Sequence, residues 1–204
     1  MDQNKNHWYD GWFYDTLIAP NQDRIFREIK NVIEPNSTVI DVGCGTGRFS
    51  FTVADKVKKV VGVDLSKKNI DRANHSLSRK LNSKISFLHA NLSELIKKDQ
   101  HFDYAVMTYV IHEVDPAVRI NLLNEMSLIA EKIIIGDYLV PINTGFWSVL
   151  NEIVEFLAGK EHYRNFKNFV ANNGLMDLAS KTNFKVITEI KNRPVTSQVL
   201  VLQH

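Results

Sequence analysis

A glycine-rich turn between an apolar strand and a helix constrains this chain more than any other feature. The segment runs Val39-Ile-Asp-Val-Gly-Cys-Gly-Thr-Gly47, and the sequence after it predicts a helix. Glycine lets a chain turn tightly and lets the backbone approach a ligand, because no Cβ stands in between. In open α/β sheets, ligands bind at this place, beyond the carboxyl end of a strand. The turn therefore predicts an α/β sheet with a ligand at its edge.

Short apolar runs alternate with amphipathic segments along most of the chain. This alternation is typical of strands that helical crossovers join into a mostly parallel sheet. Helices are expected over residues 21–33, after the N-cap Ser66, and from Asp115-Pro116, where a capping carboxylate precedes proline. The apolar face of the last of these helices is expected to carry Val118, Leu122, Met126 and Ile129. Five strands are expected, at Thr38–Asp41, Val60–Asp64, Ile85–His89, Phe102–Thr108 and Lys132–Tyr138.

The pattern changes after Pro141. Residues 144–157 and 162–170 predict helices rich in aromatic side chains, and strands resume at 184–190 and 195–202. The last two strands are close in sequence and should pair as an antiparallel hairpin. We therefore expect an α/β fold with a doubly wound, mostly parallel seven-stranded sheet, an antiparallel C-terminal hairpin and a helical insert after strand five.

Neither linkers nor repeats divide the chain, so one domain over residues 1–204 is expected. Its parts are N-terminal lid or helices over 1–35, a ligand-binding core over 38–140 and a helical insert on the substrate side over 141–173. A C-terminal helix and strands six and seven follow over 174–204.

The class of ligand follows from two positions. Asp64 ends the second strand about 20 residues after the glycine turn. A carboxylate there can accept hydrogen bonds from both hydroxyls of a ribose. The dinucleotide pattern Gly-x-Gly-x-x-Gly would need a small third residue, but Arg48 stands in that position. The pattern indicates an adenosine-type ligand and disfavours a nicotinamide dinucleotide.

The segments VIDVGCGTG and VVGVDLS resemble the first two motifs of the class I S-adenosylmethionine-dependent methyltransferases, particularly small-molecule enzymes similar to the quinone-biosynthesis type. Phe102-Asp-Tyr-Ala-Val-Met-Thr-Tyr-Val-Ile-His-Glu-Val114 resembles the fourth motif, and Ile133-Ile-Ile-Gly-Asp-Tyr138 resembles the fifth-strand motif. The resemblance covers about residues 38–138. It implies a Rossmann-like fold, S-adenosyl-L-methionine as cofactor and S-adenosyl-L-homocysteine as product.

The resemblance also implies a set of cofactor-binding residues. Asp41 and the turn Gly43, Cys44, Gly45, Thr46, Gly47 would hold the methionine end, Asp64 the ribose, and Leu65 the adenine. Asn91, followed by Leu92, stands where the family usually has an Asp near the adenine amine. Thr108 and Tyr109 would border the methyl group. Tyr9 or Tyr14, in an N-terminal run that is either a packed helix or a lid, would cover the methionine part.

The chemistry is less visible than the cofactor site. Methyl transfer from a sulfonium needs alignment, exclusion of water and at most one base, so no metal is expected. His112, just past strand four, is the candidate base, and a structural role is the alternative. Acceptor-binding residues are expected in the aromatic insert, which could also be core or the interface of a homodimer: Phe146, Trp147, His162 and Tyr163.

The expected function is methyl transfer to a small apolar or aromatic acceptor, and the sequence also bears on several alternatives. A nucleic-acid methyltransferase typically carries an Asn/Asp-Pro-Pro-Tyr motif after strand four, where this chain has Thr108-Tyr-Val-Ile, so no nucleic-acid partner is expected. Arsenite methylation needs several thiols and the chain has one. A non-catalytic cofactor-binding sensor or complex subunit is the main alternative, and a dehydrogenase is disfavoured by Arg48.

Composition adds little beyond exclusions. The formal net charge is +2, from 25 basic and 23 acidic residues, which indicates no polyanionic partner. The single cysteine excludes an internal disulfide, and no apolar stretch approaches the roughly 20 residues of a membrane span. A cytoplasmic protein is the expectation.

Overall fold

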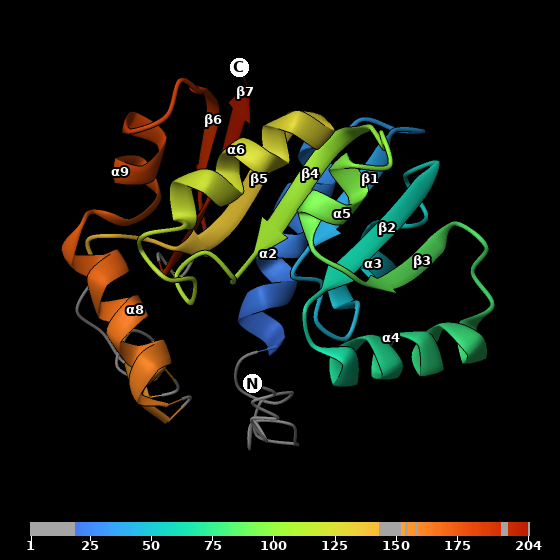
Figure 1. Cartoon of the computed structure of the whole chain (residues 1–204), viewed down its shortest axis with the longest axis horizontal. Helices are drawn as coiled ribbons and strands as arrows, with labels where there is room; N and C mark the ends of the chain where they lie inside the picture. The colour runs from blue at the N-terminus through green and yellow to red at the C-terminus, as the bar shows by residue number, and fades with distance from the viewer. Residues whose placement is uncertain (1–18, 143–151, 154, 158, 193–195, 204) are drawn as a thin grey trace.

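The computed structural model describes residues 19–142, 152–153, 155–157, 159–192 and 196–203. A seven-stranded sheet forms its centre, in the order β3-β2-β1-β4-β5-β7-β6 (Figure 1). The strands are β1 (Thr38–Val42), β2 (Lys59–Asp64), β3 (Ile85–His89), β4 (Phe102–Thr108), β5 (Ala130–Tyr138), β6 (Lys185–Lys191) and β7 (Ser197–Gln203).

The first five strands are parallel to one another. β1 pairs with β2 on one side and β4 on the other, so that Asp41 lies in register with Gly62 and with Val106. The order reverses between β1 and β4, which is the switch point where ligands bind in doubly wound sheets. The carboxyl ends of β1, β2, β4 and β5 therefore meet along one edge of the sheet.

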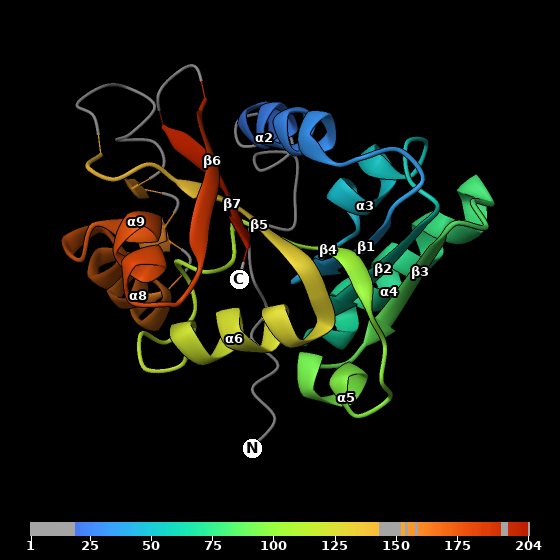
Figure 2. The ribbon, with the colours of Figure 1, turned by 90° about the horizontal axis from the view of Figure 1, so that it is seen from above.

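Helices cover both faces of the sheet, as Figure 2 shows from above. α2 (Ala19–Val32) and α3 (Arg48–Val53) bury Ile25, Ile29 and Phe49 against one face. α5 (Leu92–Ile96), α6 (Arg119–Ile129), α8 (Lys160–Ala171) and α9 (Gly174–Ser180) contribute to the core on the other face. α4 (Lys67–Lys80) packs against β2 and β3. The expected seven-stranded, doubly wound α/β fold is confirmed.

The C-terminal hairpin is confirmed, and its last strand, β7, lies inside the sheet between β5 and β6. β7 is antiparallel both to β5 and to β6, so the chain passes β5, forms the edge strand β6 and returns between them. Burial explains the order, because six of the seven β7 residues are buried whereas β6 alternates between exposed and half-buried residues. A long apolar run such as Val199–Leu202 is suited to a position covered on both sides.

The start of α6 differs from the expectation. The helix begins at Arg119 rather than at Asp115-Pro116, because the Asp115 carboxylate accepts the N–H of Ala117 at 2.9 Å and caps a separate turn. The buried face shifts as a result. Leu123 is fully buried with Met126 and Ile129, whereas Val118 is 47% exposed.

Other expected elements keep their places with small shifts. Ser66 caps α4 by accepting the N–H of Asn69, as predicted. Within the predicted helix 144–157 the structure describes residues 152–153 and 155–157, which are helical. Within the described residues, no helix has both the length and the apolar character needed to cross a bilayer.

Candidate functional site

The glycine turn after β1 has the backbone that only glycine adopts easily. Gly43, Gly45 and Gly47 have φ angles of +71°, +54° and +84°. A Cβ on Gly47 would lie 2.3 Å from the ring of Phe87, and one on Gly43 would lie 2.6 Å from Val110. Next to Gly45, in contrast, no atom of the described residues lies within 4 Å of the Cβ position. One face of the turn is therefore packed, and the face at Gly45 is open to a ligand.

Asp64 connects the end of β2 to this turn. Its two carboxylate oxygens accept the N–H of Gly45 at 2.8 Å and the N–H of Ser66 at 2.7 Å. Each oxygen keeps a second lone pair for a ligand hydroxyl. The next residue, Leu65, is 75% exposed, as expected of a side chain that packs on a ligand. These positions fit the ribose and adenine roles that the resemblance implies.

Asp41 lies buried under the turn. Its Oδ2 accepts a hydrogen bond from the Ser50 hydroxyl at 2.6 Å, and its Oδ1 has no hydrogen-bond partner among the described residues. Burial, against the hydrogen bond from Ser50, raises the pKa of Asp41 to about 7. A buried carboxylate with an oxygen to spare favours a ligand that brings positive charge or donors. The amino group of the cofactor's methionine end fits this requirement.

Other predicted cofactor residues have structural roles. The side chain of Asn91 caps α5 by accepting the N–H of Glu94 at 3.0 Å, and Leu92 is 3% exposed in the core. The Asn91 oxygen that was expected to meet the adenine amine is thus already engaged, and this contact stays a prediction. The Cys44 thiol is 9% exposed, and burial raises its pKa. Thr46, in contrast, is exposed in the turn.

The chain bends sharply after β4. Tyr109 has a φ of +54° and donates its N–H to the carbonyl of Gly136 at 2.8 Å, next to the half-buried Thr108. Its ring meets the Tyr138 ring edge to face, with centroids 5.5 Å apart. This bend directs the chain that follows Thr108 along the ligand edge of the sheet. It brings His112 beside the end of β5.

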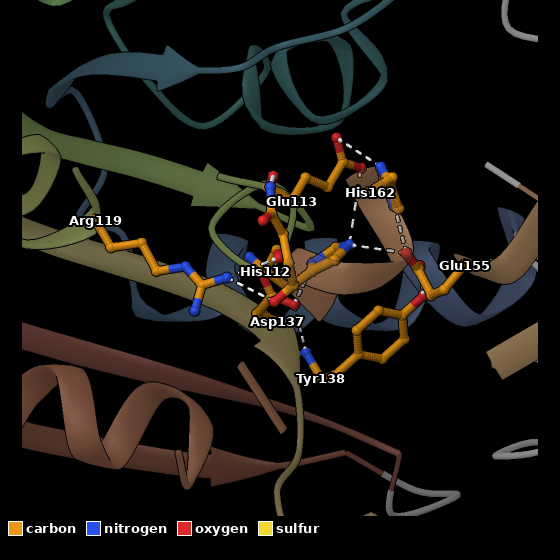
Figure 3. Close-up of polar contacts among 8 residues, drawn as sticks. His112, Glu113, Arg119, Asp137, Tyr138, Glu155 and His162 are labelled. Atoms are coloured by element: carbon orange, nitrogen blue, oxygen red, sulfur yellow. Dashed lines mark hydrogen bonds and ion pairs between the residues drawn. The ribbon is translucent and has the colours of Figure 1, made fainter. Parts of the chain in front are cut away.

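His112 lies at the centre of a group that we call the His112–His162 cluster: His112, Glu113, Asp137, Glu155 and His162 (Figure 3). The His112 side chain is 2% exposed. Its Nδ1 lies 2.7 Å from Asp137 Oδ1, and its Nε2 lies 3.5 Å from Glu155 Oε2 and 3.7 Å from Glu113 Oε1. Asp137 thereby orients the ring so that Nε2 points into the cluster.

The second half of the cluster comes from the insert and α8. Glu155 accepts a hydrogen bond from the Tyr138 hydroxyl at 2.7 Å and is bonded to His162 Nε2. Burial alone would raise the pKa of Glu155. The positive charges of His112 and His162 outweigh burial and lower this pKa well below its ordinary value. Burial lowers the pKa of His112. The negative charges of Asp137 and Glu155 outweigh this effect and raise the pKa well above its ordinary value. The cluster is held together by charge.

Arg119 anchors the loop that carries His112 and Glu113. It is 3% exposed and donates to the carbonyls of His112, Val114 and Asn165 at 3.1, 3.0 and 2.7 Å. Asn165 completes the connection by donating to the Glu113 carbonyl at 2.8 Å. The loop after β4 is therefore bound to α8 by two side chains, Arg119 from the start of α6 and Asn165 from α8.

The structure thus brings His112 and His162, two predicted site residues, into one cluster. Tyr163, the next residue, points its hydroxyl to Glu152 instead, at 2.8 Å. Tyr9, Tyr14, Phe146 and Trp147 lie outside the described residues. The roles of Glu113, Arg119, Asp137 and Glu155 were not predicted, because each depends on contacts with segments far apart in the chain. A signal was present in the pair His112-Glu113 directly after a buried strand.

Comparison with known proteins agrees with this geometry. Residues 39–131 match the family described as methyltransferase domain. A demethylmenaquinone methyltransferase of Bacillus cereus is 25% identical over 146 residues, which are 67% of this chain and 61% of that protein. A 23S rRNA (uracil(1939)-C(5))-methyltransferase of Aliivibrio fischeri is 38% identical over 66 residues, which are 32% of this chain and 15% of that protein. The chain thus spans less than two thirds of the length of either relative.

Solved structures extend the likeness to the whole fold. The magnesium protoporphyrin IX methyltransferase of Synechocystis, crystallised with S-adenosylmethionine, superposes with a TM-score of 0.65 at 14% identity. The match covers 95% of this chain and 85% of the other. The matched family, the glycine turn with its two aspartates and the strand order agree with one another. Residues 39–131 therefore match a methyltransferase domain, and the chain has the fold of a methyltransferase that was crystallised with S-adenosylmethionine.

Proposed function

We propose that this protein transfers a methyl group from S-adenosylmethionine to a small acceptor that is apolar or aromatic. The observation that carries the cofactor assignment is the glycine turn, where Asp64 binds the Gly45 N–H and Asp41 keeps a buried oxygen without a partner among the described residues. The bound cofactor supplies an activated methyl group on a sulfonium. The residues of the chain then have to align the acceptor and exclude water.

The two ends of the cofactor have different requirements. Asp64 offers one free lone pair on each carboxylate oxygen to the ribose hydroxyls. Asp41 in its ionised form pairs with the methionine amino group, which compensates for the cost of a buried charge. Gly45 leaves space beside the turn, so the ligand can approach the backbone closely.

The acceptor side is assigned to the carboxyl ends of β4 and β5. A role of His112 as a base stays a prediction, because Asp137 holds its Nδ1 and its Nε2 faces the carboxylates of Glu155 and Glu113. Aromatic rings surround the cluster, including Tyr138, whose ring centroid is 4.9 Å from that of His112, and Phe166 at 6.1 Å. Likeness to a demethylmenaquinone methyltransferase supports an aromatic acceptor. A homodimer and a cytoplasmic location stay predictions.

Turnover tests the proposal. The protein is incubated with S-adenosylmethionine labelled in the methyl group and a panel of phenols, hydroquinones, aromatic amines and rRNA fragments. We expect label in an aromatic small molecule, together with stoichiometric S-adenosylhomocysteine. Asp64→Ala should raise the KM for S-adenosylmethionine, whereas the matched change Asp71→Ala, at an exposed ion pair on α4, should not. Cofactor binding without any methyl transfer would favour the non-catalytic sensor, and label in rRNA alone would contradict a small acceptor.

A further inference from the structure

The His112–His162 cluster is held together by charge, and its side chains are also of the types that bind metal ions. It gathers two imidazoles and three carboxylates from the loop after β4, the end of β5, the insert and α8 (Figure 3). We propose that His112, Glu113 and His162 bind one divalent transition-metal ion of the zinc type. The methyltransferase fold does not require such an ion, and the inference does not rest on the proposed function.

Distances between the candidate ligand atoms suit one ion. One nitrogen or oxygen from each of His112, Glu113 and His162 lies within 4.8 Å of the others. Glu113 connects the two histidines, with Oε1 3.7 Å from His112 Nε2 and Oε2 3.8 Å from His162 Nδ1. Ligands bound tetrahedrally at about 2.1 Å are roughly 3.4 Å apart. The two distances exceed this value by a few tenths of an ångström, and the three ligand atoms would have to draw together from within 4.8 Å of one another to bind one ion.

Each histidine is also supported in the way that metal ligands usually are. Metal-bound imidazoles commonly hold a carboxylate on the nitrogen that does not bind the metal. Here Asp137 contacts His112 Nδ1 at 2.7 Å, and Glu155 contacts His162 Nε2. The remaining nitrogens, His112 Nε2 and His162 Nδ1, are the two that face Glu113. The same orientation recurs on two histidines from unrelated segments.

His112 provides an independent observation. Its side chain is 2% exposed, and the carboxylates of Glu155 and Glu113 approach its Nε2 at 3.5 and 3.7 Å, which is longer than a normal hydrogen bond. Buried polar atoms are rarely left in this state, because the loss of hydration is not compensated. A metal ion at this nitrogen would give it a close partner. The three carboxylates supply the negative charge that a divalent cation needs.

The donor set and its access select the kind of ion. Two imidazoles with one carboxylate are typical ligands of Zn²⁺ and Fe²⁺, whereas Mg²⁺ and Ca²⁺ prefer oxygen donors. The Glu113 side chain is 44% exposed, and that of His162 is 14% exposed. An ion can therefore reach the ligands from the side of Glu113 without opening of the core.

Metal binding to the full chain tests the inference without cofactor or acceptor. Protein treated with a chelator and desalted is titrated by calorimetry with Zn²⁺, and with Mg²⁺ for comparison. We expect one Zn²⁺ per chain and no comparable binding of Mg²⁺. Glu113→Gln keeps the size of the side chain and removes the charged ligand, and His162→Ala removes an imidazole. Each variant should weaken Zn²⁺ binding by about a hundredfold or more, above the cost of losing a supporting partner.

His101→Ala is the matched control, because His101 forms an exposed pair with Asp99, 3.1 Å apart, that could bind zinc adventitiously. Circular dichroism shows whether each variant keeps its fold, and the partly exposed Glu113 makes Glu113→Gln the safest one. Unchanged affinity in a folded Glu113→Gln variant would overturn the proposal. So would loss of Zn²⁺ binding in His101→Ala alone, or no stoichiometric binding by the unaltered chain.

Discussion

At the scale of single residues, Asp41 couples stability to pH. Its pKa is raised from an ordinary value of 3.8 to about 7, chiefly by burial. The favourable contribution of the protonated form is fully present below pH 3.8 and is lost as the pH rises through 7. Asp41→Asn removes this loss. Relative to the unaltered chain, its free energy of unfolding should therefore gain about 2 kcal/mol between pH 5.5 and pH 8.

Urea unfolding of the ligand-free proteins at the two pH values measures this difference. A constant difference between variant and unaltered chain would show that Asp41 does not titrate in this range. The same variant should bind S-adenosylmethionine more weakly, because a neutral amide does not pair with the methionine amino group. Asp41 would then be a residue whose charge costs stability and serves binding.

Substitution by alanine is expected to have different consequences at two glycines of the turn. In Gly47→Ala the new Cβ would lie 2.3 Å from the Phe87 ring, so a loss of about 2 kcal/mol or more in unfolding free energy is expected. In Gly45→Ala the Cβ enters open space, and only backbone strain of about 1–2 kcal/mol applies. Thermal unfolding and calorimetry separate the two effects. Gly45→Ala should fold and lose cofactor affinity, and unchanged affinity there would place the ligand elsewhere.

At the scale of elements, Arg119 joins the loop after β4 to α8. Arg119→Ala leaves the carbonyls of His112, Val114 and Asn165 without their donor in a buried place. We expect a loss of about 3 kcal/mol in unfolding free energy, from several unsatisfied carbonyl groups. Arg79→Ala, on the exposed side of α4, is the control and should change stability little. Equal effects of the two changes on the free energy of unfolding would mean that the hydrogen bonds of Arg119 do not stabilise the fold.

The elements show which predictions a sequence supports. Five parallel strands and the hairpin were predictable, because apolar runs and turn residues are local signals. The start of α6 was not, because Asp115 caps a turn of its own and Arg119 is held by contacts with α8. The short helix α5 was missed because its cap, Asn91, was assigned to the cofactor.

At the scale of the whole molecule, the two halves of the site differed in how far they could be predicted. The proposed cofactor half lies in two continuous segments around Asp41 and Asp64, so its residues could be proposed from spacing and resemblance. The His112–His162 cluster draws on residues 112, 113, 137, 155 and 162, which only the folded sheet and the insert bring together. No local pattern marks Glu155 as the partner of two histidines.

The central claim is that the turn between β1 and α3, with Asp64, binds S-adenosylmethionine. Calorimetric titration with S-adenosylhomocysteine, and with NAD in parallel, tests it most directly. The unaltered chain and Asp71→Ala should bind S-adenosylhomocysteine and not NAD, and Asp64→Ala should lose most of that affinity while keeping its fold. Binding of NAD instead, or S-adenosylhomocysteine binding that Asp64→Ala leaves unchanged, would contradict the account.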